Sequence, residues 1–371
     1  MLNSATHVAS LKPMTLDPLP SRPLVSILVS SYNYAPYLQE AIESALCQTY
    51  DNLEFIICDD GSTDGSAEII EGYRSRDIRI KAIHQTNGGQ GQALNSAFSV
   101  STGEIICLLD ADDVFLPCKL QYVVNAFATA PNAGFAINRM LKVNKIRKYL
   151  GLTPVLYKLP SGWKGASWCL GPRTMGGFPP CSGLSMRRCV AEAIFPLPAG
   201  LKAYADMPIQ ALAPLLTPIV AIQTPLGEYR VHGSNVAGVS KFTEDRLRNL
   251  VVYEKELWRI WRQRLKSTSL ELDSDFHFPP EKAPSLMAYA YARFRSDCGS
   301  KSIFWAIPPE YFRTLPRIYR WYWRASILLP NWLFRKSFNF VYGQTRAKMF
   351  VGRVLDICRN SLWIRNKAVK F

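Results

Sequence analysis

The sequence predicts an α/β protein with a mostly parallel sheet, helices on both faces of that sheet, and a helical, basic and aromatic C-terminal region. Three observations support this fold class. Short apolar runs alternate four times with segments of helical periodicity in the first 130 residues. Polar loops follow these apolar runs. Basic and aromatic residues are concentrated in the C-terminal third.

Four apolar runs predict the strands of this sheet. They cover residues 24–29, 54–58, 78–83 and 105–109. Between them, apolar residues recur at helical spacing at 38–46, 69–70 and 93–98, which predicts amphipathic helices. The run at 78–83 alternates apolar and polar residues, so we expect it near an edge of the sheet.

The last of these runs is followed by three carboxylates, Asp110, Asp112 and Asp113. If the chain turns here, Asp110 and Asp112 converge on one point, and paired carboxylate oxygens suit Mg²⁺ or Mn²⁺. The alternative is that Asp112 or Asp113 caps a helix that begins near Leu116. Both roles are open at this point, and Asp113 can serve as a cap even if the other two acids bind a metal.

Polar side chains also follow the other predicted strands. They are Ser31, Tyr32 and Asn33 after the first strand, the segment Asp59 to Asp64 after the second, and Asn87 to Gly91 after the third. Gly61 permits a tight turn, and one of residues 62–64 is expected to cap the next helix. The glycines at 88–91 match neither the G-x-G-x-x-G nor the G-x-x-x-x-G-K-[ST] nucleotide-binding motif. Two interpretations are open: the loop places backbone N–H groups near a phosphate, or it is a loop that precedes a helix. Each loop alone is typical of a turn, but together they predict one crevice, because parallel strands end at the same edge.

The net charge of +15 belongs to the C-terminal third of the chain. Residues 241–371 hold 25 Lys and Arg against 11 Asp and Glu, whereas residues 1–240 are nearly neutral. The nine cysteines show no metal-binding spacing, which is typical of a reducing compartment. We recognise no signal peptide in residues 1–22 and no apolar run of about 18 residues, the length that spans a membrane. We therefore expect the protein in the cytoplasm, either free or attached peripherally to the inner face of the membrane.

The end of the chain is the most basic and aromatic part. Residues 301–371 contain 14 basic residues, two acidic residues and 16 aromatic residues. An anionic membrane surface suits this composition, because Trp and Tyr favour the interface and Lys and Arg are attracted to acidic lipid. The alternative is a helical appendage that packs on the first domain and exposes a basic face. Nucleic-acid binding has no support in the first half, so no nucleic-acid partner is expected.

Four of these segments, in this order, resemble the motifs of the family 2 glycosyltransferases. They are Val25–Asn33, Cys58–Asp64, Asn87–Gly89 and Leu109–Asp113. The resemblance covers residues 23–235 and implies the Rossmann-like GT-A fold, a nucleotide-diphosphate sugar donor, a divalent metal (Mn²⁺ or Mg²⁺) and inversion at the anomeric carbon. It also implies a sugar or lipid-linked acceptor and a role in cell-surface polysaccharide, lipopolysaccharide or glycoconjugate synthesis.

The resemblance carries over to single residues. It implies that the nucleotide sugar contacts Ser31, Tyr32, Asn33, Asp59, Asp60, Asn87, Gly88, Asp110 and Ala111. It implies that the metal is held by Asp112 and Asp110, with His232 from the family-like Gly227–Asn235 segment as a further contact and Arg230 beside it. One departure is Ala93-Leu94-Asn95, where many members read Ala-Arg-Asn, so a donor contact from that arginine is not available.

An inverting transfer needs a base near the acceptor hydroxyl. The family places an acid at the start of a helix downstream of the acceptor loops, and the match here is Tyr204-Ala205-Asp206-Met207, which makes Asp206 the candidate base. The alternative is that Asp206 is the N-cap of a helix over 208–215, and both roles can hold. Residues 131–180 are expected to form acceptor-side loops, which contain Trp163, Trp168 and Arg173. A tryptophan more often packs in the protein than binds a sugar, so packing is the more common role for the two tryptophans.

These observations predict a polar leader over residues 1–22, a glycosyltransferase domain over 23–240 and a helical basic region over 241–371. The donor half of the domain is expected at 23–130 and the acceptor half at 131–240. Two other functions are less consistent with the sequence. A nucleotidyltransferase of similar fold would carry a Gly-rich signature with a basic residue near the start of the chain, which is missing. A non-catalytic, basic, membrane-associated binding protein would have no need of the acids at the strand ends.

Overall fold

The computed structural model describes residues 12–154, 158–163, 178–198, 204–232, 286–296, 300–307 and 317–342, together with scattered residues between 243 and 259. These residues belong to two compact units. The sheet unit contains the described residues from 14 to 232, and the helical unit contains those from 243 to 342. Trp168, Arg173 and most of the C-terminal basic residues lie outside the described residues.

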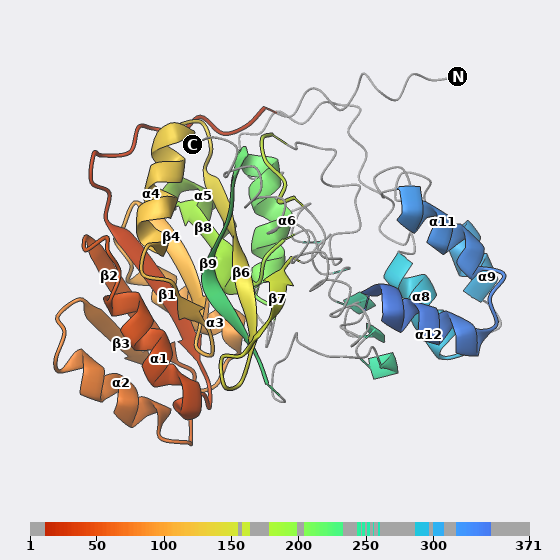
Figure 1. The fold of residues 1–371 in the computed structure, drawn as a ribbon, viewed down its shortest axis with the longest axis horizontal. Helices are drawn as coiled ribbons and strands as arrows, with labels where there is room; N and C mark the ends of the chain where they lie inside the picture. The colour runs from red at the N-terminus through yellow and green to blue at the C-terminus, as the bar shows by residue number, and fades with distance from the viewer. Residues whose placement is uncertain are drawn as a thin grey trace, which may run out of the picture. The chain divides into compact units, whose positions relative to one another are not determined.

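One mixed sheet runs through the sheet unit (Figure 1). Its strand order is β3 (Ile80–His84), β2 (Leu53–Asp59), β1 (Val25–Ser31), β4 (Ile105–Asp110), β8 (Leu184–Arg187), β6 (Phe135–Asn144), β9 (Ile219–Val231) and β5 (Val114–Phe115), and β7 (Tyr149–Thr153) pairs with β6. The strands β3, β2, β1 and β4 are parallel, as predicted, and β3 lies at an edge. The strand β8 is antiparallel to both β4 and β6, and β6 and β9 are parallel to each other.

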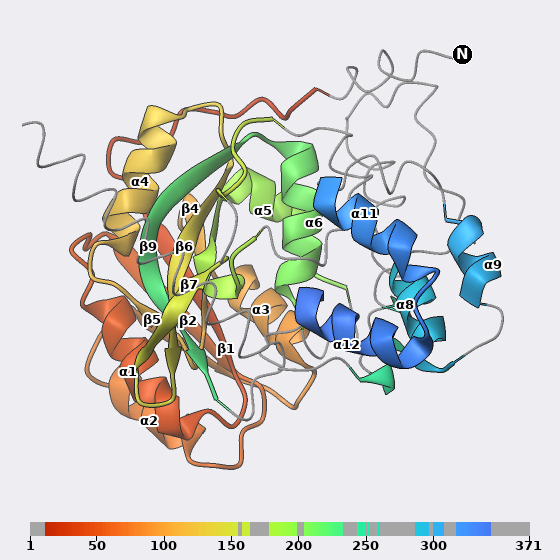
Figure 2. The same cartoon turned by 45° about the vertical axis from the view of Figure 1, so that its right-hand side comes forward.

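Helices cover both faces of the sheet (Figures 1 and 2). They are α1 (Ala35–Leu46), α2 (Ser66–Arg74), α3 (Gln90–Ser99), α4 (Lys119–Thr129), α5 (Arg188–Ile194) and α6 (Asp206–Leu216). Alternate residues of β1, such as Val25 and Ile27, share one core with Leu38 of α1 and Leu120 of α4. The helix α3 packs against β1 and β2 from the other face. The predicted α/β fold class is therefore confirmed.

The predicted cap of α2 is wrong. Gly65 is the N-cap, with φ of 87°, rather than one of residues 62–64. Asp64 still serves the start of α2, because its Oδ1 accepts a hydrogen bond from the backbone N–H of Ser66 (3.2 Å), while its Oδ2 accepts one from the backbone N–H of Ala35 (3.0 Å) at the start of α1. The predicted cap at Asp112 or Asp113 is also wrong, because β5 follows these residues and α4 begins later, after Cys118.

The expectation of loops over residues 131–180 is wrong for β6 and β7. The ten-residue strand β6 is almost entirely buried although it contains Asn138, Arg139 and Lys142. These polar side chains interrupt the apolar pattern that would have predicted a strand. Two of them find distant partners: Asn138 accepts a hydrogen bond from Lys119 Nζ (2.7 Å), and Arg139 donates one to the carbonyl of Pro154 (3.4 Å).

The helical unit contains α8 (Leu286–Phe294), α9 (Ser300–Trp305), α11 (Arg317–Ser326) and α12 (Asn331–Tyr342). Its core is a cluster of aromatic side chains that includes Tyr289, Phe304, Trp323, Phe334 and Phe338. The predicted helical basic region over 241–371 lies mostly outside the described residues. Among the helices that the structure describes, none has the length and apolar character needed to span a membrane.

Candidate active site

The carboxyl ends of the parallel strands meet at one edge of the sheet, as the sequence predicted. In the strand register, Ser31 at the end of β1 pairs with Asp59 at the end of β2, which in turn pairs with His84 of β3. On the other side of β1, Ser30 pairs with Asp110 at the end of β4. The loops that carry the candidate residues therefore start from neighbouring points, which is where open α/β sheets bind ligands.

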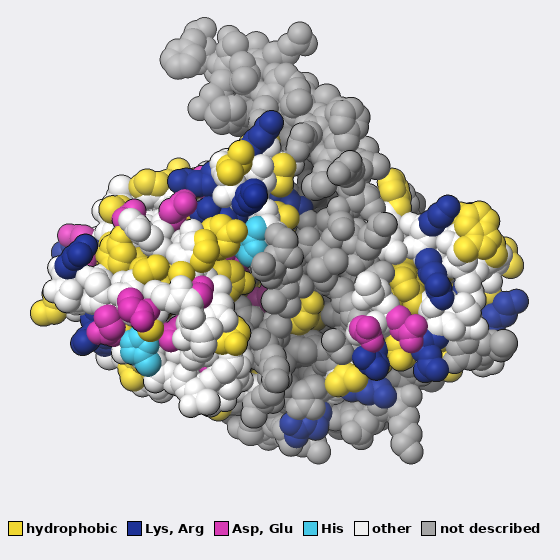
Figure 3. Space-filling model, turned by 90° about the horizontal axis from the view of Figure 1, so that it is seen from below, with side chains coloured by type: hydrophobic (Ala, Val, Ile, Leu, Met, Phe, Trp, Pro, Cys, Tyr) yellow, Lys and Arg dark blue, Asp and Glu magenta, His cyan; other side chains and the backbone are white. Residues whose placement is uncertain are grey.

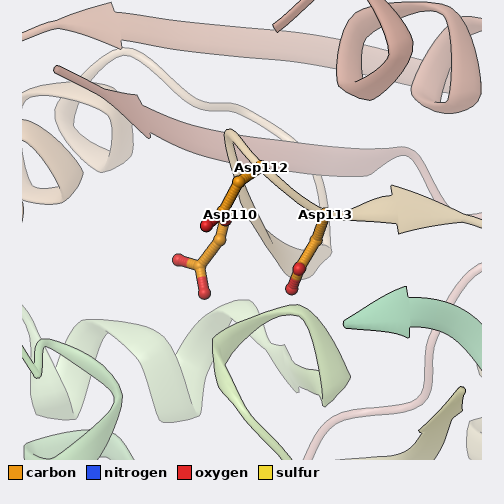
Figure 4. Close-up of side chains that lie close together, drawn as sticks. All are labelled: Asp110, Asp112 and Asp113. Atoms are coloured by element: carbon orange, nitrogen blue, oxygen red, sulfur yellow. The ribbon is translucent and has the colours of Figure 1, made fainter. Parts of the chain in front are cut away.

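The three acids after β4 form one cluster. Ligand oxygens of Asp110, Asp112 and Asp113 lie within 4.8 Å of one another, and Figure 4 shows Asp110 and Asp112 close together with Asp113 directed apart from them. Asp113 is fully buried, and both of its oxygens accept hydrogen bonds, from Ser182 Oγ (2.6 Å) and from the backbone N–H of Arg230 (2.9 Å). Asp113 therefore ties the loop to its surroundings.

Asp110 and Asp112 are the two acids of this cluster that fit a divalent cation. Burial, followed by the charges of neighbouring carboxylates, raises the pKa of Asp110 well above its ordinary value. A cation between the two acids would offset this repulsion, and carboxylate oxygens are the ligands that Mg²⁺ and Mn²⁺ prefer. Ala111 between them is buried in the core of the sheet unit. Asp110 also accepts a hydrogen bond from Gln90 Nε2 (3.0 Å), and Asp112 pairs with His232 Nε2 (2.9 Å).

The end of β9 closes over this loop. The ring of His232 stacks on Tyr37 with centroids 4.6 Å apart. Arg230 is buried, donates to the carbonyl of Asp112 (3.0 Å) and forms an ion pair with Glu40 (2.8 Å). The structure thus brings His232 to Asp112, and it engages the Arg230 guanidinium within the protein.

Asp60 holds the glycine loop. Its Oδ1 accepts hydrogen bonds from Gln85 Nε2 (2.8 Å) and from the backbone N–H of Gly88 (2.8 Å), and its Oδ2 accepts one from the backbone N–H of Gly89 (2.7 Å). Gly89 has φ of 90°, a conformation that favours glycine, and it is the N-cap of α3. Asn87 lies exposed next to this anchored segment.

Two buried polar atoms at the edge have no hydrogen-bond partner within the described part of the chain. They are Ser31 Oγ and Asp59 Oδ1, and the two residues are neighbours in the strand register. Buried polar atoms are nearly always hydrogen-bonded, so such a pair indicates a place where a ligand supplies the partner. Asn33 accepts a hydrogen bond from the backbone N–H of Thr63 (2.8 Å), which joins the first two loops, and Tyr32 is exposed beside it.

Asp206 is the first residue of α6, and the alternative that it is the N-cap is wrong, because Ala205 takes that position. Its carboxylate accepts a hydrogen bond from Gln210 Nε2 (2.9 Å), and burial raises its pKa to about 6. Gln90 joins this helix to the acidic cluster: its Nε2 donates to Asp110, and its Oε1 accepts from the backbone N–H of Ala205 (3.1 Å).

The sequence analysis missed Gln90 and Lys119. Ser182 lies in the segment Cys181–Ser185, which resembles the segment under the acceptor site of the family 2 glycosyltransferases, but its bonds to the acids were not predicted. Ser182 Oγ accepts a hydrogen bond from the backbone N–H of Asp110 (2.9 Å) and donates one to Asp113 Oδ2 (2.6 Å). Lys119 is fully buried and donates to the carbonyl of Ser182 (2.8 Å), and burial lowers its pKa to about 8. The available signal was a lysine on the apolar face of the predicted helix, which indicates a buried polar partner.

Comparison with known proteins agrees with the geometry of this site. A family model described as glycosyl transferase family 2 matches residues 26–186. An uncharacterized glycosyltransferase of Nostoc sp. is 37% identical over 225 residues, which cover 57% of this chain and 66% of the relative. Glycosyltransferase GlyG of Streptococcus pneumoniae is 47% identical over 92 residues, which cover 24% of this chain and 31% of GlyG. The chain thus spans less than two thirds of the length of either relative.

A crystal structure of S. aureus TarS 1-349 has the same fold, with a TM-score of 0.52 and 18% identity, and the match covers 84% of this chain and 89% of that chain. The GT-A fold that the sequence motifs implied is therefore confirmed. Because the family model covers the strands and loops that carry most of the candidate residues, residues 26–186 of this chain are similar to glycosyl transferase family 2.

Proposed function

We propose that the protein is an inverting glycosyltransferase, which moves a sugar from a nucleotide-diphosphate sugar to an acceptor hydroxyl. The main support for the proposal is that one side chain, Gln90, links the acidic cluster to the start of α6, where the candidate base lies. Gln90 contacts Asp110 of the acidic cluster and the backbone of Ala205, next to Asp206, which has a raised pKa. A donor-binding acid and a candidate base therefore face one site, as a single displacement requires.

The nucleotide of the donor would bind at the ends of β1 and β2. The unpartnered Ser31 Oγ and Asp59 Oδ1 would bond to the nucleoside, and the exposed Tyr32 would lie against it. Asp60 would act indirectly, by holding Gly88 and the glycine loop in place. Support for this type of donor comes from the related fold of S. aureus TarS 1-349, which has been crystallised in complex with UDP-GlcNAc (TM-score 0.52).

A divalent cation, Mg²⁺ or Mn²⁺, would be held by Asp110 and Asp112, with His232 orienting Asp112. The chemistry that such an ion supplies is neutralisation of the charge on a departing diphosphate. Asp113 keeps the loop in shape through Ser182 and Arg230, so the two ligand acids need little reorganisation when the ion binds.

Asp206 would take the proton of the acceptor hydroxyl. As that proton moves to the carboxylate, the acceptor oxygen forms a bond to the anomeric carbon and the bond from that carbon to the diphosphate breaks. Attack from the face opposite the leaving group inverts the anomeric configuration. A pKa of about 6 leaves most of Asp206 ionised at neutral pH, yet makes it a better proton acceptor than an ordinary aspartate.

The acceptor side is proposed from the sequence. A sugar or lipid-linked acceptor, used in the synthesis of cell-surface polysaccharide, lipopolysaccharide or another glycoconjugate, fits the family and the basic, aromatic C-terminal region. A peripheral position at the inner face of a membrane is part of the same proposal. The division into a leader (1–22), a transferase domain (23–240) and a basic region (241–371) likewise stays a prediction.

Donor binding is tested first. A panel of nucleotide-diphosphate sugars is titrated calorimetrically with Mn²⁺ or Mg²⁺ into the wild type, Asp112→Asn and Asp51→Asn, an exposed aspartate of the sheet unit. We expect metal-dependent binding of a donor to the wild type and to Asp51→Asn, and at least about a tenfold loss in Asp112→Asn, because a ligand charge is removed. Equal binding by Asp112→Asn, or binding of no donor by the folded wild type, would contradict the proposal.

A further inference from the structure

The outer sides of α11 and α12 expose large apolar side chains. Among the described residues, every exposed tryptophan lies in the helical unit: Trp305, Trp321 and Trp332. Leu328, in the turn between α11 and α12, is 86% exposed, and Trp321 is 77% exposed. Single exposed apolar residues are common, but several tryptophans on one small unit indicate a surface that meets something other than water.

On α12 these residues follow the helical repeat. Trp332, Lys336 and Phe340 are spaced by four residues, so they share one face, and Lys336 Nζ lies 5.3 Å from the centre of the Trp332 ring. The opposite face carries Phe334 and Phe338, which are fully buried in the aromatic core. The helix therefore has an inner apolar face that is already packed and an outer face that mixes apolar and basic side chains.

The helix α11 has the same arrangement. Trp323 is buried in the aromatic core, whereas Trp321 and Arg324, three residues apart, are exposed away from it. Leu328 continues this outer side into the turn before α12. We call the exposed side chains of α11, α12 and the turn between them, namely Trp321, Arg324, Leu328, Trp332 and Lys336, the outer face.

The segment that forms the outer face is basic. Residues 317–342 contain five basic residues and no acidic residue. Hydrophobic and basic side chains lie side by side on the helical unit at the right of Figure 3, where acidic side chains are also present. This combination complements anionic phospholipid, because Trp favours the headgroup region and the apolar stems of Lys and Arg lie along the membrane while their charges reach lipid phosphates. An aliphatic Leu328 at the most exposed point fits lipid better than nucleic acid, which binds by stacking on aromatic rings.

We propose that the outer face docks on an anionic phospholipid surface, with Trp321, Leu328 and Trp332 inserted among the headgroups and Arg324 and Lys336 on the lipid phosphates. This extends the proposed function by naming the residues that bring the site to a lipid-linked acceptor. Lipid binding is measured without donor, so it can fail while the donor site stands, and the reverse also holds.

The test is flotation of the full chain with vesicles of phosphatidylcholine alone or with about a third phosphatidylglycerol. We expect the wild type to float with the anionic vesicles and to be released by salt. The pair Arg324→Gln and Lys336→Gln should lower the partition coefficient about 30-fold, at roughly 1 kcal/mol for each charge. The pair Trp321→Ala and Trp332→Ala should lower it at least tenfold. An exposed pair in the sheet unit, Arg74→Gln and Tyr122→Ala, is the matched control and should float as the wild type does.

Each other result overturns the proposal. Equal flotation with neutral and anionic vesicles would remove the electrostatic part, and equal flotation of the outer-face and control variants would place the contact elsewhere. A fluorescent oligonucleotide and size-exclusion chromatography are run alongside. Tight oligonucleotide binding without flotation would assign the face to nucleic acid, and a dimer dissolved by the tryptophan variants would assign it to a second copy. Unchanged circular dichroism and donor affinity show that each variant is folded.

Discussion

The acids at the sheet edge are all aspartates, but the structure divides them into two groups that the sequence does not distinguish. Asp60 and Asp113 give both of their oxygens to hydrogen-bond donors of the protein, several of which are backbone amides. Asp110 and Asp112 are contacted by the side chains of Gln90 and His232 instead, and the pKa of Asp110 is raised by burial and by its acidic neighbours. Charge alone does not separate the two groups, because burial and the charges of Asp112 and Asp110 also raise the pKa of Asp113. What separates them is that Asp60 and Asp113 have backbone N–H partners.

This difference teaches how to separate anchoring acids from acids that act on a ligand. An anchoring carboxylate whose oxygens meet backbone N–H groups stabilises the fold, and its loss should lower stability. An acid held against other charges costs free energy in the folded state, and its loss should spare stability while it removes function. The following substitutions test this division, from the largest expected effect to the smallest.

Asp206→Asn should have the largest effect. It removes the proton acceptor while it keeps the shape and the hydrogen bond from Gln210, so turnover should fall at least about 1000-fold and donor affinity should stay within about twofold. The raised pKa means that the folded chain holds this proton up to about pH 6, whereas an ordinary aspartate loses it near 3.8, so the ionised group destabilises the fold as pH rises through that window. The variant should therefore melt no lower than the wild type.

Calorimetry of donor binding, a coupled assay of nucleoside diphosphate release and thermal unfolding give the three readouts. Loss of donor binding together with turnover would place Asp206 on the donor side of the site. Normal turnover would exclude it as the base.

Asp60→Asn should have the opposite profile. Its amide NH₂ would face one of two backbone N–H groups that cannot rotate away, those of Gly88 and Gly89. We expect a loss of about 2–3 kcal/mol in the free energy of unfolding, measured with urea, from one unmade bond and one donor left buried. Asp51→Asn, at an exposed site, should lose less than about 0.5 kcal/mol. Equal stability of the two variants would contradict the distinction between acids that anchor the fold and acids that act on a ligand.

The pH dependence of turnover should show the same base. With donor and metal saturating, kcat should fall about tenfold for each pH unit below about 6, since protonated Asp206 cannot accept the acceptor proton, and should level off above it. The measurement is initial rate from about pH 5 to 8 with a thermal unfolding control at each pH. A flat profile over that range would show that another step limits turnover.

The strands and the common edge were predictable because they follow from periodicity close along the chain. The apolar runs that became β1, β2 and β4 are fully buried, and parallel strands must end together. What failed depended on distant partners. The strand β6 was hidden by Asn138, whose partner Lys119 comes from another element. The N-cap of α2 is Gly65 rather than Asp64, which bridges the first turns of α2 and α1.

The sequence identifies the acidic residues of the site, but it does not show which role each of them has. Spacing alone shows four candidate acids in Asp59, Asp60, Asp110 and Asp112, and it does not show that Asp60 is engaged by Gly88 and Gly89. Gln90 could not be found at all, because its acceptor bond is to the backbone of Ala205, which lies 115 residues away.

Gln90 gives the smallest and most discriminating prediction, because it links the two sides of the site without belonging to either group of acids. In Gln90→Met the side chain keeps its length but loses the bonds to Asp110 and Ala205. A positioning role predicts a fall of about tenfold in kcat, the equivalent of one hydrogen bond, with donor affinity nearly unchanged. Gln92→Met, two residues along the same helix and exposed, is the matched control.

A purely structural role for Gln90 would lower the melting temperature and leave the kcat of the folded enzyme intact. A role in holding the donor would raise KM instead. If Gln90→Met and Gln92→Met behave alike in kcat, the bridge between Asp110 and α6 has no part in turnover, and the alignment of acceptor base and donor acids must then come from the packing of α6 itself.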